Sequence, residues 1–172
     1  VKEIGTVNVT QLMNHQNALL LDVREPSEFT GGKLPGAVHI PLSQLKGRNV
    51  VIYFYPKADT PGCTKESMDF SRLKSEFDRA GATVVGVSAD AVSAQDKFKA
   101  KHNLTVPLAS DPDRKMIEAY GVWGEKSMYG KTFMGIERAT FLVGADGRIA
   151  QVWHKVKVEG HAEEVLAAVK AL

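Results

Sequence analysis

Cys63 is the only cysteine of the 172-residue sequence, and it lies where a helix is expected to begin. Thr60 is a favourable N-cap and Pro61 suits the first helical position, so Cys63 occupies the third position of the helix. The order Thr-x-x-Cys thus places sulfur where a capping box has a carboxylate. The helix dipole and free backbone N–H groups favour negative charge there, which predicts a nucleophilic thiolate accessible to a reactant. The alternative is a buried structural cysteine.

A strand and a helix must hold this cysteine. Residues 50–55 form a β-branched and aromatic run that predicts a buried strand. Pro56 ends this strand, because proline lacks the N–H group that a ladder needs. Apolar residues then recur at helical spacing until Gly81, which predicts a helix from the cysteine to about Ala80. These residues are Phe70, Leu73, Phe77 and Ala80.

The remaining sequence alternates between predicted strands and helices, which is typical of an α/β protein. An Asp146-Gly147 turn predicts a hairpin between the last two strands, and residues 124–135 are expected to be a glycine-containing linker. The predicted strands are 6–9, 18–24, 37–40, 83–88, 106–109, 138–143 and 149–153. The predicted helices are 10–17, 93–101, one opened by 111–113, and 161–171.

Composition excludes several classes of function. With 44% hydrophobic and 24% charged residues, the chain is expected to be globular, with one large or two small domains. Its net charge of +2 does not suggest nucleic acid or a membrane as partner. One cysteine and no signal-like or spanning segment predict a cytoplasmic protein. The start at Val1 suggests a trimmed or engineered chain. His154 and His161 do not have the spacing of metal ligands, so no metal site is expected.

The N-terminal quarter resembles the first half of a rhodanese domain. The resemblance covers about residues 6–45 and rests on LLLDVREPSEF and LPGAVHIPLSQL. A rhodanese has its catalytic cysteine directly after the next central strand, where this chain has Pro56, so sulfurtransferase activity is not expected. Asp22, Arg24 and Glu28 would then be a remnant substrate site or, as we favour, a salt-bridge network.

From about residue 47 to the end, the chain resembles a peroxiredoxin of the bacterioferritin-comigratory (Q) subfamily. The motifs include YFYPKADTPGCTKE, GVSAD, LASDPD, YGKTFMGIERATFLV and VKVEGHAEEVL. The family pattern Pro-x-x-x-Thr-x-x-Cys falls on Pro56, Thr60 and Cys63, and the family's arginine matches Arg138.

The resemblance implies that Cys63 attacks a peroxide O–O bond and becomes a sulfenic acid. The Thr60 hydroxyl and the Cys63 backbone N–H would bind the peroxide. Arg138 would stabilise the thiolate and the developing oxyanion, and Pro56 would shield the pocket from water. Glu66 would contact Arg138, help to position a proton, or be a plain helix-face residue.

Relatives often carry a resolving cysteine five positions after the nucleophile, but this chain has Met68 there. The resemblance therefore implies recycling by an external thiol, such as thioredoxin, glutaredoxin or glutathione. It implies no cofactor and no metal, and we expect a monomer. Trp123 and Trp153 would line the peroxide pocket or, as we favour, pack in the core.

These observations predict a three-layer α/β/α fold with a mixed central sheet. Its C-terminal part would be thioredoxin-like, and a rhodanese-like βαβ N-terminal part would complete it. We expect residues 1–45 and 46–172 to pack as one globular domain, with strands starting at Ala18, Val50 and Thr83 in the middle of the sheet. The predicted function is a one-cysteine thiol peroxidase for hydrogen peroxide or alkyl hydroperoxides. The alternative is an engineered hybrid scaffold of rhodanese and peroxiredoxin fragments with weak or no activity.

Overall fold

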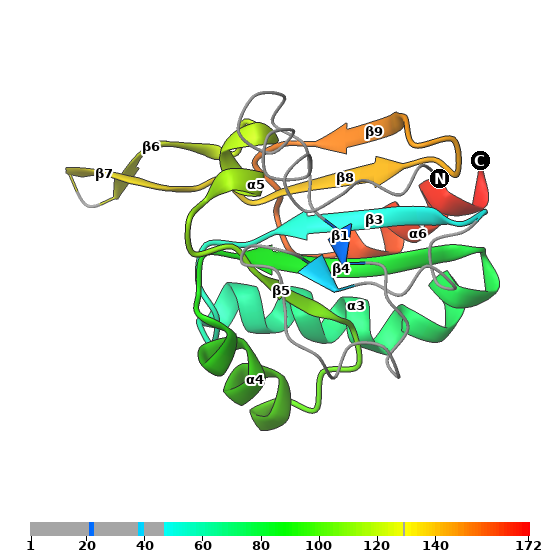
Figure 1. The fold of residues 1–172 in the computed structure, drawn as a ribbon, viewed down its shortest axis with the longest axis horizontal. Coiled ribbons are helices and arrows are strands. Elements are labelled where there is room, and N and C mark those ends of the chain that lie inside the picture. Colours follow the sequence, from blue (N-terminus) through cyan, green and yellow to red (C-terminus); the bar gives the residue numbers. More distant parts are fainter. Residues whose placement is uncertain (1–20, 23–37, 40–46, 129) are drawn as a thin grey trace.

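A mixed five-stranded sheet forms the centre of the fold (Figure 1). The structure is a computed structural model that describes residues 21–22, 38–39, 47–128 and 130–172. The strand order is β5-β4-β3-β8-β9, with β3, β4 and β5 parallel to one another and β8 antiparallel to both β3 and β9. The strands are β3 (Asn49–Phe54), β4 (Ala82–Ser88), β5 (Leu108–Ser110), β8 (Ala139–Val143) and β9 (Ile149–Trp153).

Helices cover both faces of this sheet, as the α/β prediction requires. Side chains of β3 alternate between the faces: Val51 and Tyr53 belong to one core cluster, Ile52 and Phe54 to the other. The first cluster packs against α3 (Pro61–Arg79), α4 (Val92–Lys101) and α6 (His161–Lys170). The second packs against the short helix α5 (Lys115–Ala119). Because β3 is covered on both sides, its sequence is a continuous apolar run.

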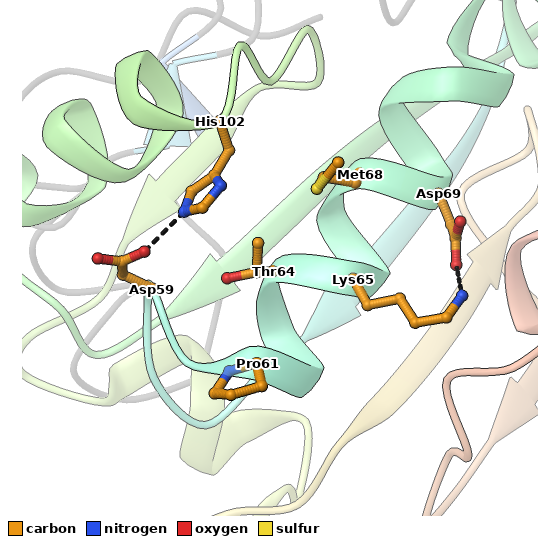
Figure 2. Close-up of a pocket in the computed structure, with 7 residues that line it drawn as sticks. All are labelled: Asp59, Pro61, Thr64, Lys65, Met68, Asp69 and His102. Carbon is orange, nitrogen blue, oxygen red and sulfur yellow. Dashed lines mark hydrogen bonds and ion pairs between the residues drawn. The ribbon is translucent and has the colours of Figure 1, made fainter.

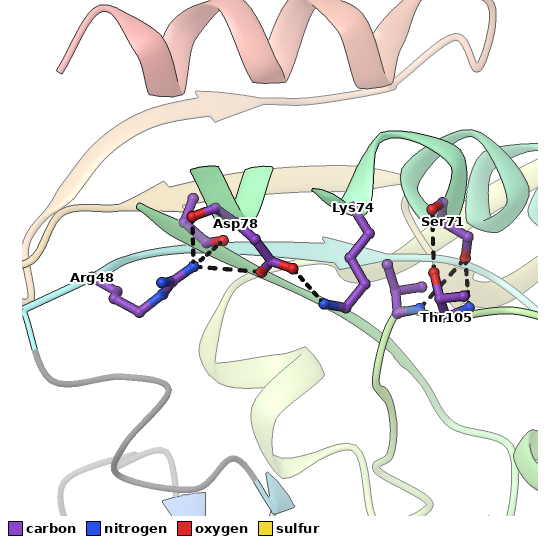
Figure 3. A network of polar contacts seen from close by, with 7 residues as sticks. Arg48, Ser71, Lys74, Asp78 and Thr105 are labelled. Carbon is purple, nitrogen blue, oxygen red and sulfur yellow. Dashed lines mark hydrogen bonds and ion pairs between the residues drawn. The ribbon is translucent and has the colours of Figure 1, made fainter. Parts of the chain in front are cut away.

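A polar network fixes the far end of α3 to the sheet (Figure 3). Arg48 donates to the Asp78 carbonyl at 3.2 Å and to the Ala82 carbonyl at 3.1 Å, and Lys74 pairs with the Asp78 carboxylate at 2.6 Å. The Thr105 backbone N–H donates to the Ser71 hydroxyl at 3.1 Å. These contacts set the direction of the helix that carries Cys63 at its other end.

The segment predicted as a linker, residues 124–135, is instead most of an antiparallel hairpin. Strand β6 (Trp123–Met128) pairs with β7 (Lys131–Ile136), and the hairpin extends away from the central sheet (Figure 1). The prediction was wrong because Gly124 and Gly135 suggested a loop, whereas they face each other across the two strands. The exposed hairpin also lacks the alternation of apolar and polar residues that marks a half-buried strand.

The strand predicted from Ala18 does not lie in the middle of the main sheet. Strand β1 (Leu21–Asp22) pairs in parallel with β2 (Val38–His39) in a separate two-stranded sheet. Both edges of β3 are occupied, by β4 and β8, so no further strand fits beside it. The other N-terminal predictions lie outside the described residues: the strand 6–9, the helix 10–17, and the roles of Arg24 and Glu28.

Candidate active site

Strand pairing brings the two ends of the site together. Strand β3 ends at Phe54, the loop through Pro56 follows, and α3 begins at Pro61. In the antiparallel pair of β3 and β8, Phe54 lies opposite Ala139. Arg138 directly precedes Ala139, so the register places it beside the loop that leads to the cysteine.

Arg138 contacts both Cys63 and Glu66. Its Nη2 atom donates to Cys63 Sγ at 3.3 Å, and Nη1 donates to Glu66 Oε2. The Cys63 residue is only 1% exposed, so the expectation of an accessible thiol was wrong. The buried sulfur nevertheless lies against a guanidinium, which is not the surroundings of an inert core cysteine.

Glu66 is a buried carboxyl group on the same helix as Cys63. Burial raises the pKa of Glu66 to about 7, although the charge and hydrogen bond of Arg138 act in the opposite direction. Its second oxygen, Oε1, has no hydrogen-bond partner in the part of the chain that the structure describes. Of the roles considered for Glu66, contact with Arg138 is confirmed, and a plain position on the helix face is excluded.

Gly62 allows Arg138 to approach the start of the helix. A Cβ atom at Gly62 would lie 3.2 Å from Arg138 Nη2, a tighter contact than nine in ten real Cβ atoms make. The guanidinium therefore lies across the first turn of α3, next to the sulfur. The sequence motif contains this glycine, but the need for it, the close approach of Arg138, can be seen only in the structure.

Thr60 is the N-cap residue of α3, as predicted, but it does not cap the helix through its side chain. Its hydroxyl donates to the Lys57 carbonyl at 2.9 Å instead, so the comparison with a capping box was wrong. The backbone N–H groups of the first turn consequently donate no hydrogen bond to the Thr60 side chain. Pro61 has no N–H, and the Thr64 N–H donates to the Thr60 carbonyl at 2.8 Å, as in the first regular bond of a helix.

Asp59 links the site loop to the end of α4 (Figure 2). Its carboxylate contacts Lys101 Nζ at 2.7 Å and His102 Nε2 at 2.6 Å, and these hydrogen bonds lower the pKa of Asp59. Asp59 has a φ of 60°, a left-handed conformation that aspartate tolerates better than most residues. A cavity of about 450 Å³ lies beside this link and is lined partly by Met68. Sequence reasoning missed Asp59, because its partners are more than 40 positions away.

A second cavity, of about 480 Å³, lies at the base of the β6–β7 hairpin. Pro56 and Arg138 line it, together with Trp123, Lys126 and other residues of the hairpin. Trp123 thus faces this cavity, whereas Trp153 packs beside His161 and donates from Nε1 to Glu164. Sequence reasoning assigned no role to Lys126, since its place in this cavity depends on the unpredicted hairpin.

The two histidines considered as metal ligands have other partners. His161 is buried and its Nε2 shares a hydrogen bond with the Thr140 hydroxyl at 2.8 Å, while His154 contacts Glu137. Within the described ranges, no group of three or more potential ligand side chains could hold a metal ion. No helix in those ranges is both long and apolar enough to cross a membrane.

Comparisons with known proteins agree with this geometry. The AhpC/TSA family model matches residues 28–152, so it overlaps part of the stretch assigned to a rhodanese half. Peroxiredoxin Bcp of Xanthomonas campestris is 51% identical over 80% of this chain and 86% of its own length. Peroxiredoxin Bcp of Bacillus subtilis is 46% identical over 76% of this chain and 83% of its own length.

Solved structures are similar as well. A structure of the Xanthomonas campestris bacterioferritin comigratory protein, described with its alkyl peroxide reduction activity, has a TM-score of 0.72 and 51% identity. It covers 79% of this chain, which covers 87% of it. BcpB of Mycobacterium tuberculosis has a TM-score of 0.66 and 35% identity, with coverage of 76% and 83%. The chain therefore belongs to the AhpC/TSA family and, within it, to the peroxiredoxins named Bcp or peroxiredoxin Q.

Proposed function

We propose that Cys63 is the peroxidatic residue of a one-cysteine thiol peroxidase that reduces hydrogen peroxide or alkyl hydroperoxides. The observation that carries this proposal is the contact of Arg138 Nη2 with Cys63 Sγ at 3.3 Å. A guanidinium remains charged at all relevant pH values and stabilises a neighbouring thiolate. The reported alkyl peroxide reduction by the Xanthomonas relative supports the same class of substrate.

In the oxidative step, the Cys63 thiolate attacks the terminal oxygen of the hydroperoxide. An S–O bond forms, the O–O bond breaks, and the alkoxide leaves as an alcohol after taking up a proton. The sulfur is oxidised to a sulfenic acid, and the peroxide is reduced. Arg138 lies close enough to stabilise both the attacking sulfur and the charge that develops on the oxygens.

Thr60 and Pro56 would complete the site. The Thr60 hydroxyl would bind the peroxide after leaving the Lys57 carbonyl, and the Cys63 backbone N–H would donate to the same oxygen. Pro56 lines the same cavity as Arg138 and would limit the access of water to it.

Reduction of the sulfenic acid requires a thiol from outside these 172 residues, which contain no second cysteine. Thioredoxin, glutaredoxin and glutathione are the candidates, and their use fits a reducing compartment such as the cytoplasm. We propose that the chain acts as a monomer.

The function is tested by the consumption of peroxide with dithiothreitol, comparing the chain with the variant Cys63→Ser. We expect rapid consumption by the chain and only the background rate with the variant. Equal rates would reject the peroxidase function. Labelling of Cys63 with a sulfenic-acid probe after one equivalent of peroxide identifies the oxidised atom.

A second candidate is a hybrid scaffold, in which a rhodanese-like half (1–45) joins a peroxiredoxin part (46–172) in one globular unit. The rhodanese-like motifs and the separate β1–β2 pair favour it. This proposal predicts a folded chain with little peroxide consumption that depends on Cys63. A thiosulfate and cyanide assay tests for sulfur transfer, and thiocyanate formation above background would overturn the view that this activity is absent.

A further inference from the structure

Three cationic side chains line the cavity at the base of the β6–β7 hairpin, and two of them are lysines without an ion pair among the described residues. Lys126, Arg138 and Lys155 line it. Lys126 Nζ donates to the Ile136 carbonyl at 2.6 Å. In the part of the chain that the structure describes, neither Lys126 nor Lys155 forms an ion pair through its ammonium group.

The two carboxylates that line this cavity, Glu125 and Glu137, form no ion pair with either lysine among the described residues. Glu137 accepts hydrogen bonds from His154 Nδ1 at 2.8 Å and from the Lys155 backbone N–H at 3.3 Å. Glu66, the partner of Arg138, belongs to α3 and does not line the cavity. Glu125 lines the cavity but is exposed to solvent. A ligand that brought its own negative charge would therefore be favoured.

The cavity is electrostatically connected to the sulfur. Burial lowers the pKa of Lys126, and the charge of Arg138 lowers it further, whereas the charges of Cys63 and Glu137 act in the opposite direction. Lys126 thus lies near enough to Arg138 and Cys63 for their charges to affect its pKa. Arg138 lines the cavity and also contacts Sγ, so its side chain connects the cavity to the reacting atom, although Cys63 itself does not line the cavity.

We propose that this cavity is a carboxylate-binding subsite for the small thiol that reduces the Cys63 sulfenic acid, with Lys126 and Lys155 as the binding groups. This inference rests on the proposed function. Hydrogen peroxide and simple alkyl hydroperoxides carry no charge, whereas glutathione, one of the reductants named above, brings two carboxylates. At about 480 Å³, the cavity is within the range of small-molecule sites.

The reductive step balances with two molecules of thiol. The first attacks the sulfenic sulfur, an S–S bond forms, and the oxygen leaves as water with the protons of the thiol and the sulfenic acid. The second thiol attacks the mixed disulfide, which releases Cys63 and forms the oxidised disulfide of the small thiol. Binding of the carboxylate would hold the first thiol for this attack.

Binding is tested without catalysis, on the Cys63→Ser variant, by calorimetry with S-methylglutathione and its diethyl ester. We expect the acid to bind about tenfold more tightly than the ester, as for a hydrogen-bonded charge pair. Lys126→Gln should remove most of this preference, Lys126→Arg should retain it, and Lys155→Gln provides a second variant outside the hairpin. Lys131→Gln, on the exposed part of β7, is the matched control and should leave the preference unchanged. Equal binding of acid and ester would overturn the proposal.

Kinetics identify the reactant. With hydrogen peroxide as oxidant, we expect a higher kcat/KM for glutathione than for its ethyl ester, and Lys126→Gln should remove the difference. An effect confined to the oxidation of Cys63 by a carboxylate-bearing hydroperoxide would overturn the assignment to the thiol, as would recycling by thioredoxin alone. Sulfenic-acid labelling without thiol keeps the two proposals distinct: failure to oxidise Cys63 rejects the peroxidase function itself.

Discussion

Arg138 Nη2 lies 3.3 Å from Cys63 Sγ, although the two residues are 75 positions apart in the sequence. The contact depends on the pairing of β3 with β8, which aligns Phe54 with Ala139. It gives the buried cysteine a permanent positive neighbour.

Replacing Arg138 by Gln should slow the oxidation of Cys63 by peroxide by about two to three orders of magnitude. The variant loses the charge beside the sulfur and the donor to the leaving oxygen, an effect of the size seen for lost oxyanion donors. Stopped-flow fluorescence during a single turnover measures it. Arg148→Gln, in the exposed turn before β9, is the control and should react at the normal rate. Equal rates for the two variants would contradict the role of Arg138.

Replacing Gly62 by Ala should slow the reaction with peroxide without lowering the stability of the chain. Alanine is the better helix former, by about 1 kcal/mol in a helix interior, so the chain should be no less stable. The new Cβ would lie 3.2 Å from Arg138 Nη2 and displace a guanidinium that Glu66 holds on its other side. We expect several-fold slower reaction with peroxide. Denaturant unfolding and single-turnover rates measure the two effects, and unchanged reactivity would show that Arg138 adapts freely.

Glu66 should make stability depend on pH in an uncommon direction. Because its pKa is raised to about 7, the folded chain binds more protons than the unfolded chain between the usual value of 4.5 and 7. Its contribution to stability is therefore present below pH 4.5 and is lost as the pH rises towards 7. Glu66→Gln should flatten this part of the curve of unfolding free energy against pH. Glu76→Gln, on the same helix, is the control, and a slope that persists in Glu66→Gln would refute the assignment.

Asp59 should make stability depend on pH in the direction opposite to that of Glu66. Hydrogen bonds from Lys101 and His102 lower its pKa, so its stabilising effect is present above the ordinary value of 3.8 and is lost as the pH falls through the lower, folded-state value. Asp59→Asn keeps a side chain that tolerates positive φ but removes the charge. We expect faster amide hydrogen exchange in the site loop at neutral pH. Asp96→Asn, on the exposed side of α4, should leave this exchange unchanged.

Replacing Met68 by Cys should give the chain its own resolving thiol. The position is 49% exposed and five residues after Cys63 in α3. The two Cα atoms are about 8 to 9 Å apart in a regular helix, too far for a disulfide, so the first turns must unwind. After one equivalent of peroxide, mass spectrometry should find an intramolecular disulfide. Met134→Cys, in the hairpin, should form none, and a persistent sulfenic acid in Met68→Cys would show that α3 does not open.

Sequence patterns predicted the elements that carry strong local signals. The apolar run of β3, the helical spacing of α3 and the Asp-Gly turn before β9 each depend on neighbouring residues, and each is confirmed. The partnership of Cys63 with Arg138 came from a family pattern rather than from physics. Neither the burial of Cys63 nor the link from Asp59 to Lys101 could be predicted, because both depend on segments that only the tertiary fold brings together.

The β3–β8 register also has a consequence for biosynthesis. A ribosome completes Cys63 and its helix long before it reaches Arg138, and the strand that positions Arg138 is the fourth of the five in the central sheet to be made. Until then, the nascent chain carries a thiol without its guanidinium neighbour. If Arg138 has the role proposed above, rapid reaction with peroxide requires the last third of the chain to have folded, and a register slip of one residue would turn Arg138 away from the sulfur. The rate at which Cys63 reacts with peroxide would therefore indicate whether β8 has paired with β3.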